Sequence, residues 1–198
     1  MKAIIKADTI DKYLRSIRFQ IVELIDPNTT LIELGCGNGD LLFKLAGKLK
    51  LGVGIDKSEQ LITYASNRVK KEQVKNLEFR LMDLLKDSYS EPNMDYSVAS
   101  LLLHILPLEK SIELIKKLLA SSNTTIICGF CEPKNIRQKM LLWLDQRFTS
   151  HYSNFRDYKR NGFTEGLLNS IEKIKYDRID TFDPVIKIYK ITKSNKDV

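Results

Sequence analysis

Long apolar segments are missing from this sequence of 198 residues. A membrane-spanning helix needs about 18 or more uncharged apolar residues in a row, and no such window occurs. The first residues include Asp8 and Asp11, which interrupt the apolar core that an export signal requires. We therefore expect a soluble protein that is not exported and is located in the cytoplasm.

Cysteine and histidine are also scarce. The cysteines are Cys36, Cys128 and Cys131, and the histidines are His104 and His151. The odd number of cysteines and the apolar run around Cys128 and Cys131 argue against a disulfide framework, which fits a reducing compartment. A zinc site at this C-x-x-C pair would need a second pair of ligands. We expect two small core side chains there and no metal site.

Positive charge is unevenly distributed along the chain, whose formal net charge is +7. Residues 1–133 hold 18 Lys and Arg against 17 Asp and Glu, whereas residues 134–198 hold 14 against 8. Such an excess favours an anionic small molecule, a nucleic acid or a membrane surface as a partner. A solvated lysine-rich face is the simpler alternative, and the charge alone does not decide between them.

Short β-rich runs alternate with longer segments of helical periodicity over the first two thirds of the chain. An N-terminal helix over about residues 8–26 ends at Asp26-Pro27-Asn28. The runs that follow predict strands at 29–35, 51–56, 76–83, 94–103 and 124–130, and helices at 40–49, 58–72 and 108–122. This order is typical of an α/β protein with a mainly parallel sheet.

The alternation stops after Pro133. Residues 135–148 have helical periodicity, but residues 150–162 are polar and rich in aromatics and do not predict a regular core element. We interpret about 133–162 as an inserted cover segment. A short helix at 163–171 and two alternating strands at 172–180 and 184–192 complete the chain. The whole predicts a single domain with a doubly wound, mainly parallel seven-stranded sheet, helices on both faces and a C-terminal antiparallel β-hairpin.

A glycine-rich loop is the most informative motif. The sequence Glu-Leu-Gly-Cys-Gly-Asn-Gly, residues 33–39, stands where an apolar strand ends and an amphipathic helix begins. Glycines there let a ligand lie directly against the backbone at a helix N-terminus, and the carboxylate of Glu33 could meet an ammonium group. The next two strands end in Asp56 and Asp83. Open parallel sheets bind ligands at this edge, where an acid after the second strand accepts hydrogen bonds from ribose hydroxyls.

In their order and spacing, these features resemble class I S-adenosylmethionine-dependent methyltransferases of the small-molecule type, from Thr30 to Thr192. The resemblance implies a Rossmann-like methyltransferase fold and S-adenosylmethionine as cofactor. It implies that the loop wraps the methionine part, that Asp56 holds the ribose, and that Asp83 binds the adenine amino group. The cofactor-binding residues expected from it are Glu33, Gly35, Cys36, Gly37, Gly39, Asp56, Lys57, Met82, Asp83, Leu84 and Ser100, of which Met82 and Leu84 line the adenine ring.

A nicotinamide dinucleotide is the main competing cofactor. Its fingerprint is G-x-G-x-x-G, and counting from Gly35 places the third glycine at position 40, which is Asp40. A carboxylate there would face the pyrophosphate that the motif binds. S-adenosylmethionine carries a positive sulfonium and no phosphate, so an acidic loop is electrostatically tolerable. The sequence therefore favours the methyl donor.

The strand at 94–103 is expected to end near the transferred methyl group, followed by His104. That histidine resembles one that many small-molecule methyltransferases carry there; it could act as a general base if the acceptor must lose a proton, or it could be structural. DNA and RNA amino-methyltransferases carry an N/D-P-P-Y/F motif at this place, and cytosine C5 enzymes a Pro-Cys. Neither motif is present, which favours a small-molecule or lipid-precursor acceptor. A noncatalytic cofactor-binding module and a nucleic-acid or protein methyltransferase stay open as alternatives.

An aromatic and basic cluster lies in the cover segment. It comprises Arg147, His151, Tyr152, Phe155, Arg156, Tyr158, Lys159 and Arg160. These side chains could hold an anionic or aromatic acceptor, or the aromatics could anchor the segment while the cations are solvated. Tyr13, Arg15 and Arg18 on the first helix are further candidates for closing the same site. The oligomeric state is left undetermined by the sequence.

Overall fold

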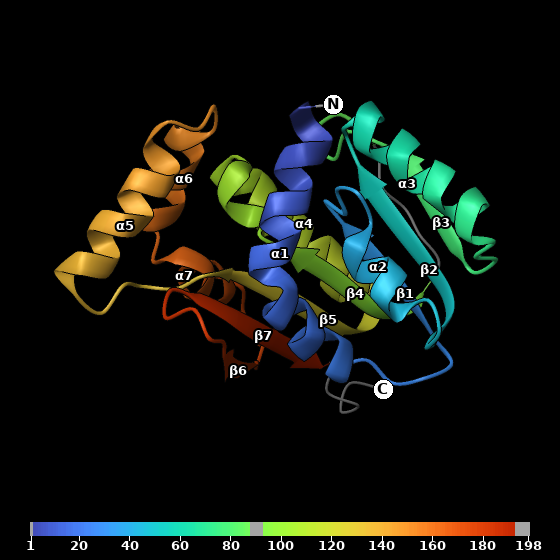
Figure 1. Ribbon diagram of the computed structural model, residues 1–198. Helices are drawn as coiled ribbons and strands as arrows, with labels where there is room; N and C mark the ends of the chain where they lie inside the picture. Colours follow the sequence, from blue (N-terminus) through green and yellow to red (C-terminus); the bar gives the residue numbers. More distant parts are fainter. Residues whose placement is uncertain (1, 88–92, 193–198) are drawn as a thin grey trace. The chain divides into compact units, whose positions relative to one another are not determined.

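The computed structural model describes residues 2–87 and 93–192. The seven strands follow the order β3-β2-β1-β4-β5-β7-β6 (Figure 1). The chain divides into two compact units, one of residues 1–99 with 121–123 and the other of residues 100–120 with 124–198. Within the described part of the chain, no helix combines the length and the apolar character that crossing a membrane requires.

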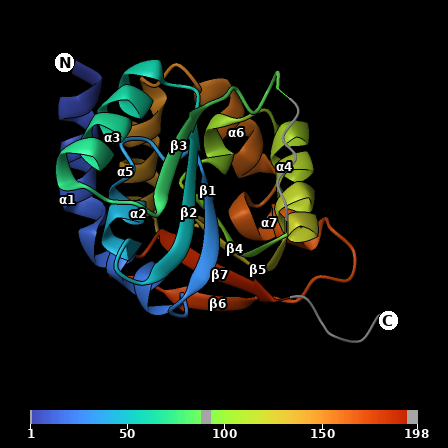
Figure 2. The same ribbon diagram turned by 90° about the vertical axis from the view of Figure 1, so that its right-hand side faces the viewer.

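The first unit contains four parallel strands and three helices. They are α1 (Lys2–Glu23), β1 (Thr29–Leu34), α2 (Asp40–Leu45), β2 (Leu49–Asp56), α3 (Glu59–Glu72), β3 (Leu77–Leu81) and β4 (Met94–Ser100). Strand β1 pairs in parallel with both β2 and β4, and β2 pairs with β3. The three helices cover one face of β1 to β3 (Figure 2). Leu31, Ile32 and Leu34 of β1 are fully buried, so this strand is the centre of the unit's core.

Polar contacts fix the beginnings of β1 and β4. The carboxylate of Asp95 accepts hydrogen bonds from the backbone N–H and the hydroxyl of Thr30, at 2.8 and 2.9 Å. The hydroxyl of Tyr96 donates to Asp26 at 2.6 Å. Burial and this hydrogen bond raise the pKa of Tyr96 to about 12. These contacts occupy the N-terminal ends of the strands and leave the opposite, carboxyl ends for the loops that could bind a ligand.

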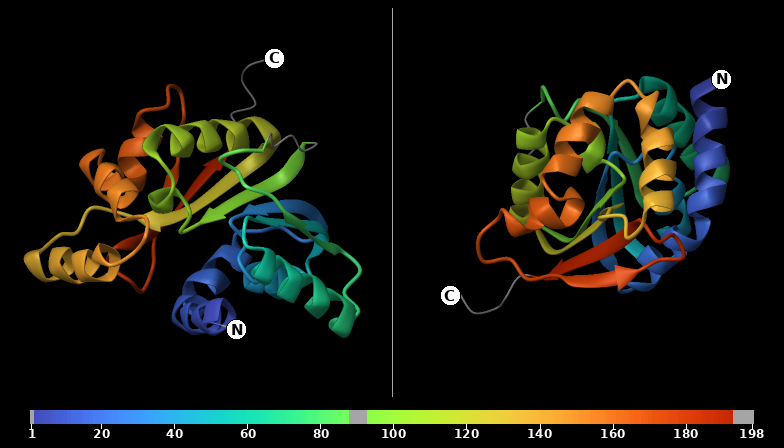
Figure 3. Two further views of the ribbon diagram at one scale, coloured as in Figure 1. Left: turned by 90° about the horizontal axis from the view of Figure 1, so that it is seen from above. Right: turned by 90° about the vertical axis from the view of Figure 1, so that its left-hand side faces the viewer.

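The second unit is built on an antiparallel part of the sheet. It contains the short 3-10 helix η1 (Leu103–Ile105), α4 (Leu108–Ser121), β5 (Ser122–Phe130), α5 (Ile136–Arg147), α6 (Tyr152–Arg160), α7 (Phe163–Asn169), β6 (Asp177–Asp180) and β7 (Ile186–Thr192). Strand β7 runs antiparallel to both β5 and β6. Helices α5 and α6 follow one another in the chain and contact each other (Figure 3).

The predicted fold class is confirmed, with differences at the ends of elements. Helix α1 begins at Lys2 and ends at Glu23, where about 8–26 was expected. Helix α2 ends at Leu45 rather than at 49, because β2 already begins at Leu49. Strand β4 ends at Ser100 rather than at 103, because Leu101 takes a positive φ of 51° that no strand accommodates. The single domain stays a prediction.

The prediction that residues 150–162 form no regular core element is wrong. They contain helix α6, on which Phe155 and Tyr158 are only 2% exposed. These two residues are three positions apart and therefore lie on one helix face. The hydroxyl of Tyr158 donates to the carbonyl oxygen of Phe130 at 3.0 Å and lies 2.6 Å from the hydroxyl of Thr164. The high polar content of the segment belongs to the exposed face of an amphipathic helix.

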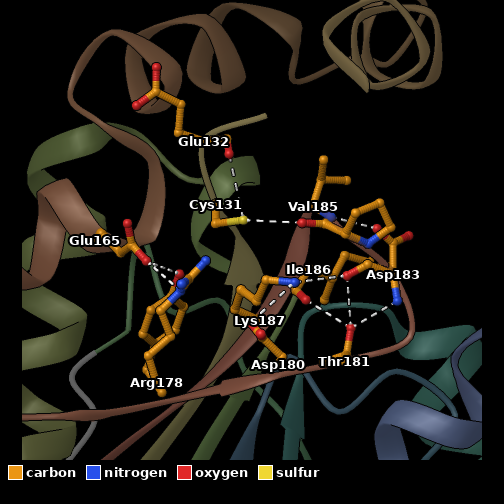
Figure 4. Close-up of polar contacts among 12 residues, drawn as sticks. Cys131, Glu132, Glu165, Arg178, Asp180, Thr181, Asp183, Val185, Ile186 and Lys187 are labelled. Atoms are coloured by element: carbon orange, nitrogen blue, oxygen red, sulfur yellow. Dashed lines mark hydrogen bonds and ion pairs between the residues drawn. The ribbon is translucent and has the colours of Figure 1, made fainter. Parts of the chain in front are cut away.

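The C-terminal hairpin is present but its first strand is short: β6 covers Asp177–Asp180 instead of 172–180. The connection to β7 is closed by polar contacts rather than by a tight turn (Figure 4). Thr181 donates through its hydroxyl to the carbonyl oxygen of Ile186 at 2.8 Å. The ammonium group of Lys187, a residue only 4% exposed, donates to the carbonyl oxygen of Asp183 at 3.1 Å. A buried lysine thus provides the hydrogen-bond donor for a backbone carbonyl group of this loop.

Candidate active site

Asp56 connects the glycine loop to the loop that follows β2. Its carboxylate accepts a hydrogen bond from the backbone N–H of Gly37 at 2.9 Å and another from that of Ser58 at 2.9 Å. The loop is also held on β2, because the N–H groups of Gly35 and Cys36 both donate to the carbonyl oxygen of Ile55. The structure therefore brings the predicted ribose-binding acid directly against the glycine loop.

The glycines of this loop have different roles. Gly35, Gly37 and Gly39 all have positive φ, at 72, 56 and 78°. A Cβ placed on Gly37 would meet no atom within 4 Å, whereas one on Gly39 would lie 2.4 Å from the ring of Phe79. Gly37 therefore leaves space beside the backbone in which a ligand could lie, and Gly39 is required for packing against β3.

The loop is acidic. Glu33 lies on β1 and is only 4% exposed, although carboxylates are rarely buried to this extent. Burial raises the pKa of the Cys36 thiol well above its usual range, and the negative charges of Glu33 and Asp56 raise it further. The loop thus suits a positively charged ligand group, and the thiol of Cys36 is neutral and therefore a poor nucleophile.

The negative charge of Asp40 is compensated by two cations. Its carboxylate binds the guanidinium of Arg18 on α1 at 2.8 Å and the ammonium of Lys44 at 2.7 Å. Both ion pairs are partly buried; the one with Arg18 links α1 to α2, whereas the one with Lys44 lies within α2. This contact does not support the expectation that Arg18 closes an acceptor site. Because Asp40 is paired, its carboxylate would not repel a pyrophosphate as a free one would, and the missing third glycine is what disfavours a dinucleotide.

The loop after β3 contains the predicted adenine-binding residues. The backbone N–H of Met82 donates to the carbonyl oxygen of Asp56 at 3.0 Å, which places this loop next to the one after β2. The carboxylate of Asp83 accepts from the N–H of Leu85 at 3.1 Å and lies 3.8 Å from the ammonium of Lys86. Leu84 is half-buried. Asp83 therefore caps a turn, and its assignment to the adenine amino group remains a prediction.

Two predicted cofactor residues have less support. Lys57 is exposed and makes no contact that bears on the loop within the described residues. Ser100 is the half-buried last residue of β4 and belongs to the second unit. Its neighbour Leu101 is held at a positive φ by a hydrogen bond from its N–H to the carbonyl oxygen of Cys128 at 2.8 Å. Strain of this kind is frequent at functional sites.

His104 lies in η1 and is surrounded by aromatic rings of the second unit. Its ring centroid is 4.9 Å from that of Phe130 and 5.5 Å from that of His151, both in edge-on geometry. Phe155 and Tyr158 are within 6.4 Å. Burial, together with the charge of His151, lowers the pKa of His104 to about 3. The imidazole is consequently neutral at pH 7 and a weak base.

The other predicted acceptor residues fall into two groups. His151, Tyr152 and Phe155 join the aromatic cluster around His104, where Tyr152 stacks on Phe155 at 6.4 Å. Arg147 lies elsewhere, with its guanidinium 4.4 Å from the ring centroid of Trp143. Tyr13 is 55% exposed. Aromatic residues of the cover segment therefore lie together around His104, and their contact with an acceptor stays a prediction.

A pocket of about 310 Å³ in the second unit is lined by Phe155, Lys159 and Arg160, which the sequence singled out, and by other residues that it did not. Lys139, Leu142 and Trp143 on α5 contribute to it, together with Phe163 at the start of α7. The spacing of Lys139, Trp143 and Arg147 at intervals of four residues contains a signal, because it places the tryptophan between two cations on one helix face.

The chain is similar to known methyltransferases in sequence and in fold. The fold is that expected for class I methyltransferases, and residues 25–160 match the family model described as "Methyltransferase domain". The chain belongs to this family.

Among curated proteins, the chain is 35% identical over 79 residues to the 235L protein of Invertebrate iridescent virus 6, covering 39% of this chain. It is 27% identical over 124 residues, 62% of this chain, to the 23S rRNA (uracil(1939)-C(5))-methyltransferase RlmD of Xanthomonas euvesicatoria pv. vesicatoria. The matched region spans 28% of the length of each of these two relatives.

Solved structures show the same fold at low sequence identity. The N-methyltransferase NodS of Bradyrhizobium japonicum, in complex with S-adenosylhomocysteine, has a TM-score of 0.66 at 16% identity, with 90% of this chain and 86% of that chain covered. The DhpI complex with the same ligand has a TM-score of 0.69 at 13% identity, with 98% and 93% covered. The fold of these proteins is therefore shared by nearly the whole chain.

The buried neutral His104 predicts a pH dependence of stability. A histidine whose pKa falls on folding leaves stability unaffected above its unfolded value of about 6.5, and reduces it as the pH drops toward the folded value of about 3. Between pH 7 and 5, we expect wild type to lose about 2 kcal/mol more than His104→Leu. Urea unfolding at the two pH values measures this difference, with His151→Asn as the matched control. Equal losses in wild type and His104→Leu would contradict the buried neutral state.

Proposed function

We propose that this chain transfers a methyl group from S-adenosylmethionine to a small-molecule or lipid-precursor acceptor. The observation that carries the proposal is the contact between Asp56 and the glycine loop, where its carboxylate accepts from the N–H of Gly37 at 2.9 Å. A carboxylate in this place can accept ribose hydroxyls while the open side of Gly37 admits the rest of the ligand. Membership in the methyltransferase family supports the same cofactor.

The residues present fit this cofactor. Burial raises the pKa of the Cys36 thiol, and the negative charges of Glu33 and Asp56 raise it further, so the loop is a negative environment for an ammonium or sulfonium group. Space beside Gly37 allows close approach to the backbone. The backbone N–H of Met82 donates to the carbonyl oxygen of Asp56, so the loop after β3 lies next to the loop after β2. This contact supports the proposal that Met82 and Leu84 line an adenine ring.

S-adenosylmethionine supplies a methyl group already activated by the sulfonium. The protein's own task is therefore chiefly to orient the two reactants and to exclude water. Glu33 and Asp56 would bind the cofactor by charge and hydrogen bonds, and the rigid attachment of the loop to β2 orients it. With a pKa of about 3, His104 would accept a hydrogen bond from the acceptor and would not remove a proton from a weakly acidic one.

The burial of the cysteine thiols disfavours methyl transfer to a pyrimidine carbon. Cytosine C5 methyltransferases use a cysteine nucleophile for this reaction. The three cysteines of this chain, Cys36, Cys128 and Cys131, are all free thiols and at most 5% exposed. Burial raises the pKa of both Cys36 and Cys131. Because the thiolate is the reactive form, none of them is placed to attack a base.

RNA is the second candidate acceptor. The similarity to RlmD and the positive charge of residues 134–198 favour it. Non-specific nucleic-acid binding arises mainly from phosphate contacts, and its affinity falls steeply with salt. Retention on immobilised RNA at 50 mM salt that disappears at 200 mM, together with methyl incorporation into RNA, would establish this acceptor class instead of a small molecule.

Calorimetric titration with S-adenosylmethionine and its demethylated product tests the cofactor. We expect micromolar binding to wild type, no competition by NADH, and a loss of at least tenfold in Asp56→Ala. Asp56→Asn can still accept one hydrogen bond, so its fold is better preserved, and it should bind with intermediate affinity. Lys50→Ala, an exposed change at the other end of β2, is the control. Binding of NADH, or unaltered binding by Asp56→Ala, would remove the proposal.

A further inference from the structure

The pocket of the second unit is formed by four segments. Glu132 and Pro133 follow β5, and the remaining lining residues come from α5, α6 and the start of α7. Its volume of about 310 Å³ is within the range of pockets that bind small molecules. All of its lining residues belong to the second unit, which contains both α5 and α6 (Figure 3).

The floor of the pocket is apolar and aromatic. Leu142, Phe155 and Phe163 are 6, 2 and 3% exposed, and Trp143 is half-buried beside them. The ring of Phe163 makes edge-on contacts with Tyr158 at 5.7 Å and with Phe155 at 6.5 Å. Such a surface offers a planar or aliphatic body a large contact area.

The position of Phe163 is obtained at a conformational cost. It has a φ of 60°, and the preceding Gly162 has a φ of 80°, so two successive residues are left-handed. An aromatic residue in this region is uncommon and strained. The turn from α6 into α7 thereby places the ring against the pocket instead of letting the helix continue.

The rim of the pocket is basic. Lys139, Lys159 and Arg160 line it, against the single carboxylate of Glu132. In the described ranges, neither lysine takes part in an ion pair, and Arg160 has only an exposed contact with Asp157 at 3.5 Å. The carboxylate of Glu132 points away from Cys131 in Figure 4 and is not paired with any of the three cations in the described part of the chain. The rim therefore has an excess of positive charge.

We propose that this pocket binds an amphipathic anion: a molecule whose apolar body packs on Trp143, Phe155 and Phe163 and whose phosphate or carboxylate pairs with Lys159 and Arg160. Cations at the edge of an apolar floor favour this combination over a neutral apolar ligand or a free inorganic anion, because each of those would satisfy only one part of the site. The binding requires neither S-adenosylmethionine nor methyl transfer, so it stands apart from the proposed function.

The fluorescence of Trp143 reports directly on binding to the pocket, because Trp143 is the only tryptophan in the sequence. We expect hexyl phosphate and hexanoate to change its fluorescence saturably, and hexanol and inorganic phosphate to bind at least tenfold more weakly. The stronger of the two anionic probes identifies the preferred head group. A response to hexanol equal to that of both anionic probes would overturn the proposal.

Charge reversal on the rim supplies the second test. Lys159→Glu with Arg160→Glu changes exposed side chains at the end of α6, so the fold should persist, and hexyl phosphate should bind at least tenfold more weakly. Lys116→Glu on α4 is also exposed and does not line the pocket, and it should bind as wild type does. Unaltered binding by the double variant, or equal weakening by Lys116→Glu, would contradict the assignment. Asp56→Ala should leave this binding intact, which separates it from the cofactor site.

Discussion

Gly37→Ala is expected to weaken S-adenosylmethionine binding by about 10- to 100-fold while the protein remains folded. The added methyl group meets no protein atom within 4 Å, so the folding cost is only that of a left-handed alanine, about 1–2 kcal/mol. The same methyl group would occupy the space in which the proposed cofactor lies, which amounts to about 1–3 kcal/mol of overpacking in the complex. Calorimetry measures the affinity, and urea unfolding measures the stability.

Gly39→Ala is the matched comparison, two residues further along the same loop. Its methyl group would lie 2.4 Å from the ring of Phe79, which is stacked on Phe43 at 5.6 Å and cannot move without disturbing α2 and β3. We expect a loss of about 3 kcal/mol or more in stability, from overpacking and from the positive φ together. If Gly37→Ala proved as destabilising as Gly39→Ala, or bound the cofactor normally, Gly37 would not face a ligand.

Tyr158→Ala is expected to reduce the stability of the second unit by about 3–5 kcal/mol, the range for removing a fully buried aromatic ring. Tyr158 holds α6 and α7 over β5, since its hydroxyl contacts the carbonyl oxygen of Phe130 and the hydroxyl of Thr164. Tyr158→Phe retains the ring but leaves these partners unsatisfied, at a cost of about 1–3 kcal/mol. Trp143 on the adjacent α5 reports unfolding of this unit by fluorescence.

A change elsewhere on the same helix serves as the control. Tyr152 is half-buried at the start of α6, and Tyr152→Ala should cost less than about 1 kcal/mol. Comparable losses for Tyr152→Ala and Tyr158→Ala would mean that α6 is a surface element, as the polar sequence of residues 150–162 suggested. A ranking of Tyr158→Ala, Tyr158→Phe and Tyr152→Ala in decreasing order of effect would support the core position.

The glycine loop was predictable because its chemistry is local. Three glycines between an apolar strand and a helix, followed by an acid at the end of the next strand, specify a ligand-binding strand edge wherever parallel strands are adjacent. The match to the methyltransferase family confirms the family that the loop indicated, and the binding roles of its residues stay predictions. The separate roles of Gly37 and Gly39 were not predictable, since Phe79, which excludes a side chain at Gly39, lies 40 residues away in sequence.

The cover segment illustrates the opposite case. Its composition is polar, and the apolar face of α6 depends on only Phe155 and Tyr158, which is too short a pattern to distinguish a helix from a loop. Their burial depends on Phe130 and Thr164, which lie outside the helix. The weak basicity of His104 likewise follows from its surroundings, because a histidine's pKa is set by its burial and neighbours and not by the residue type.

Outside residues 150–162, the sequence by itself determined the order of strands and α-helices. It also determined the glycine loop and the acid at Asp56, because hydrophobic periodicity and backbone freedom are properties of short segments. The tertiary structure decided which glycine faces open space, that Asp40 is neutralised by Arg18 and Lys44, and that Trp143 lies in a basic-rimmed pocket. These features depend on which side chains meet across elements, and packing is settled only when the whole chain has folded.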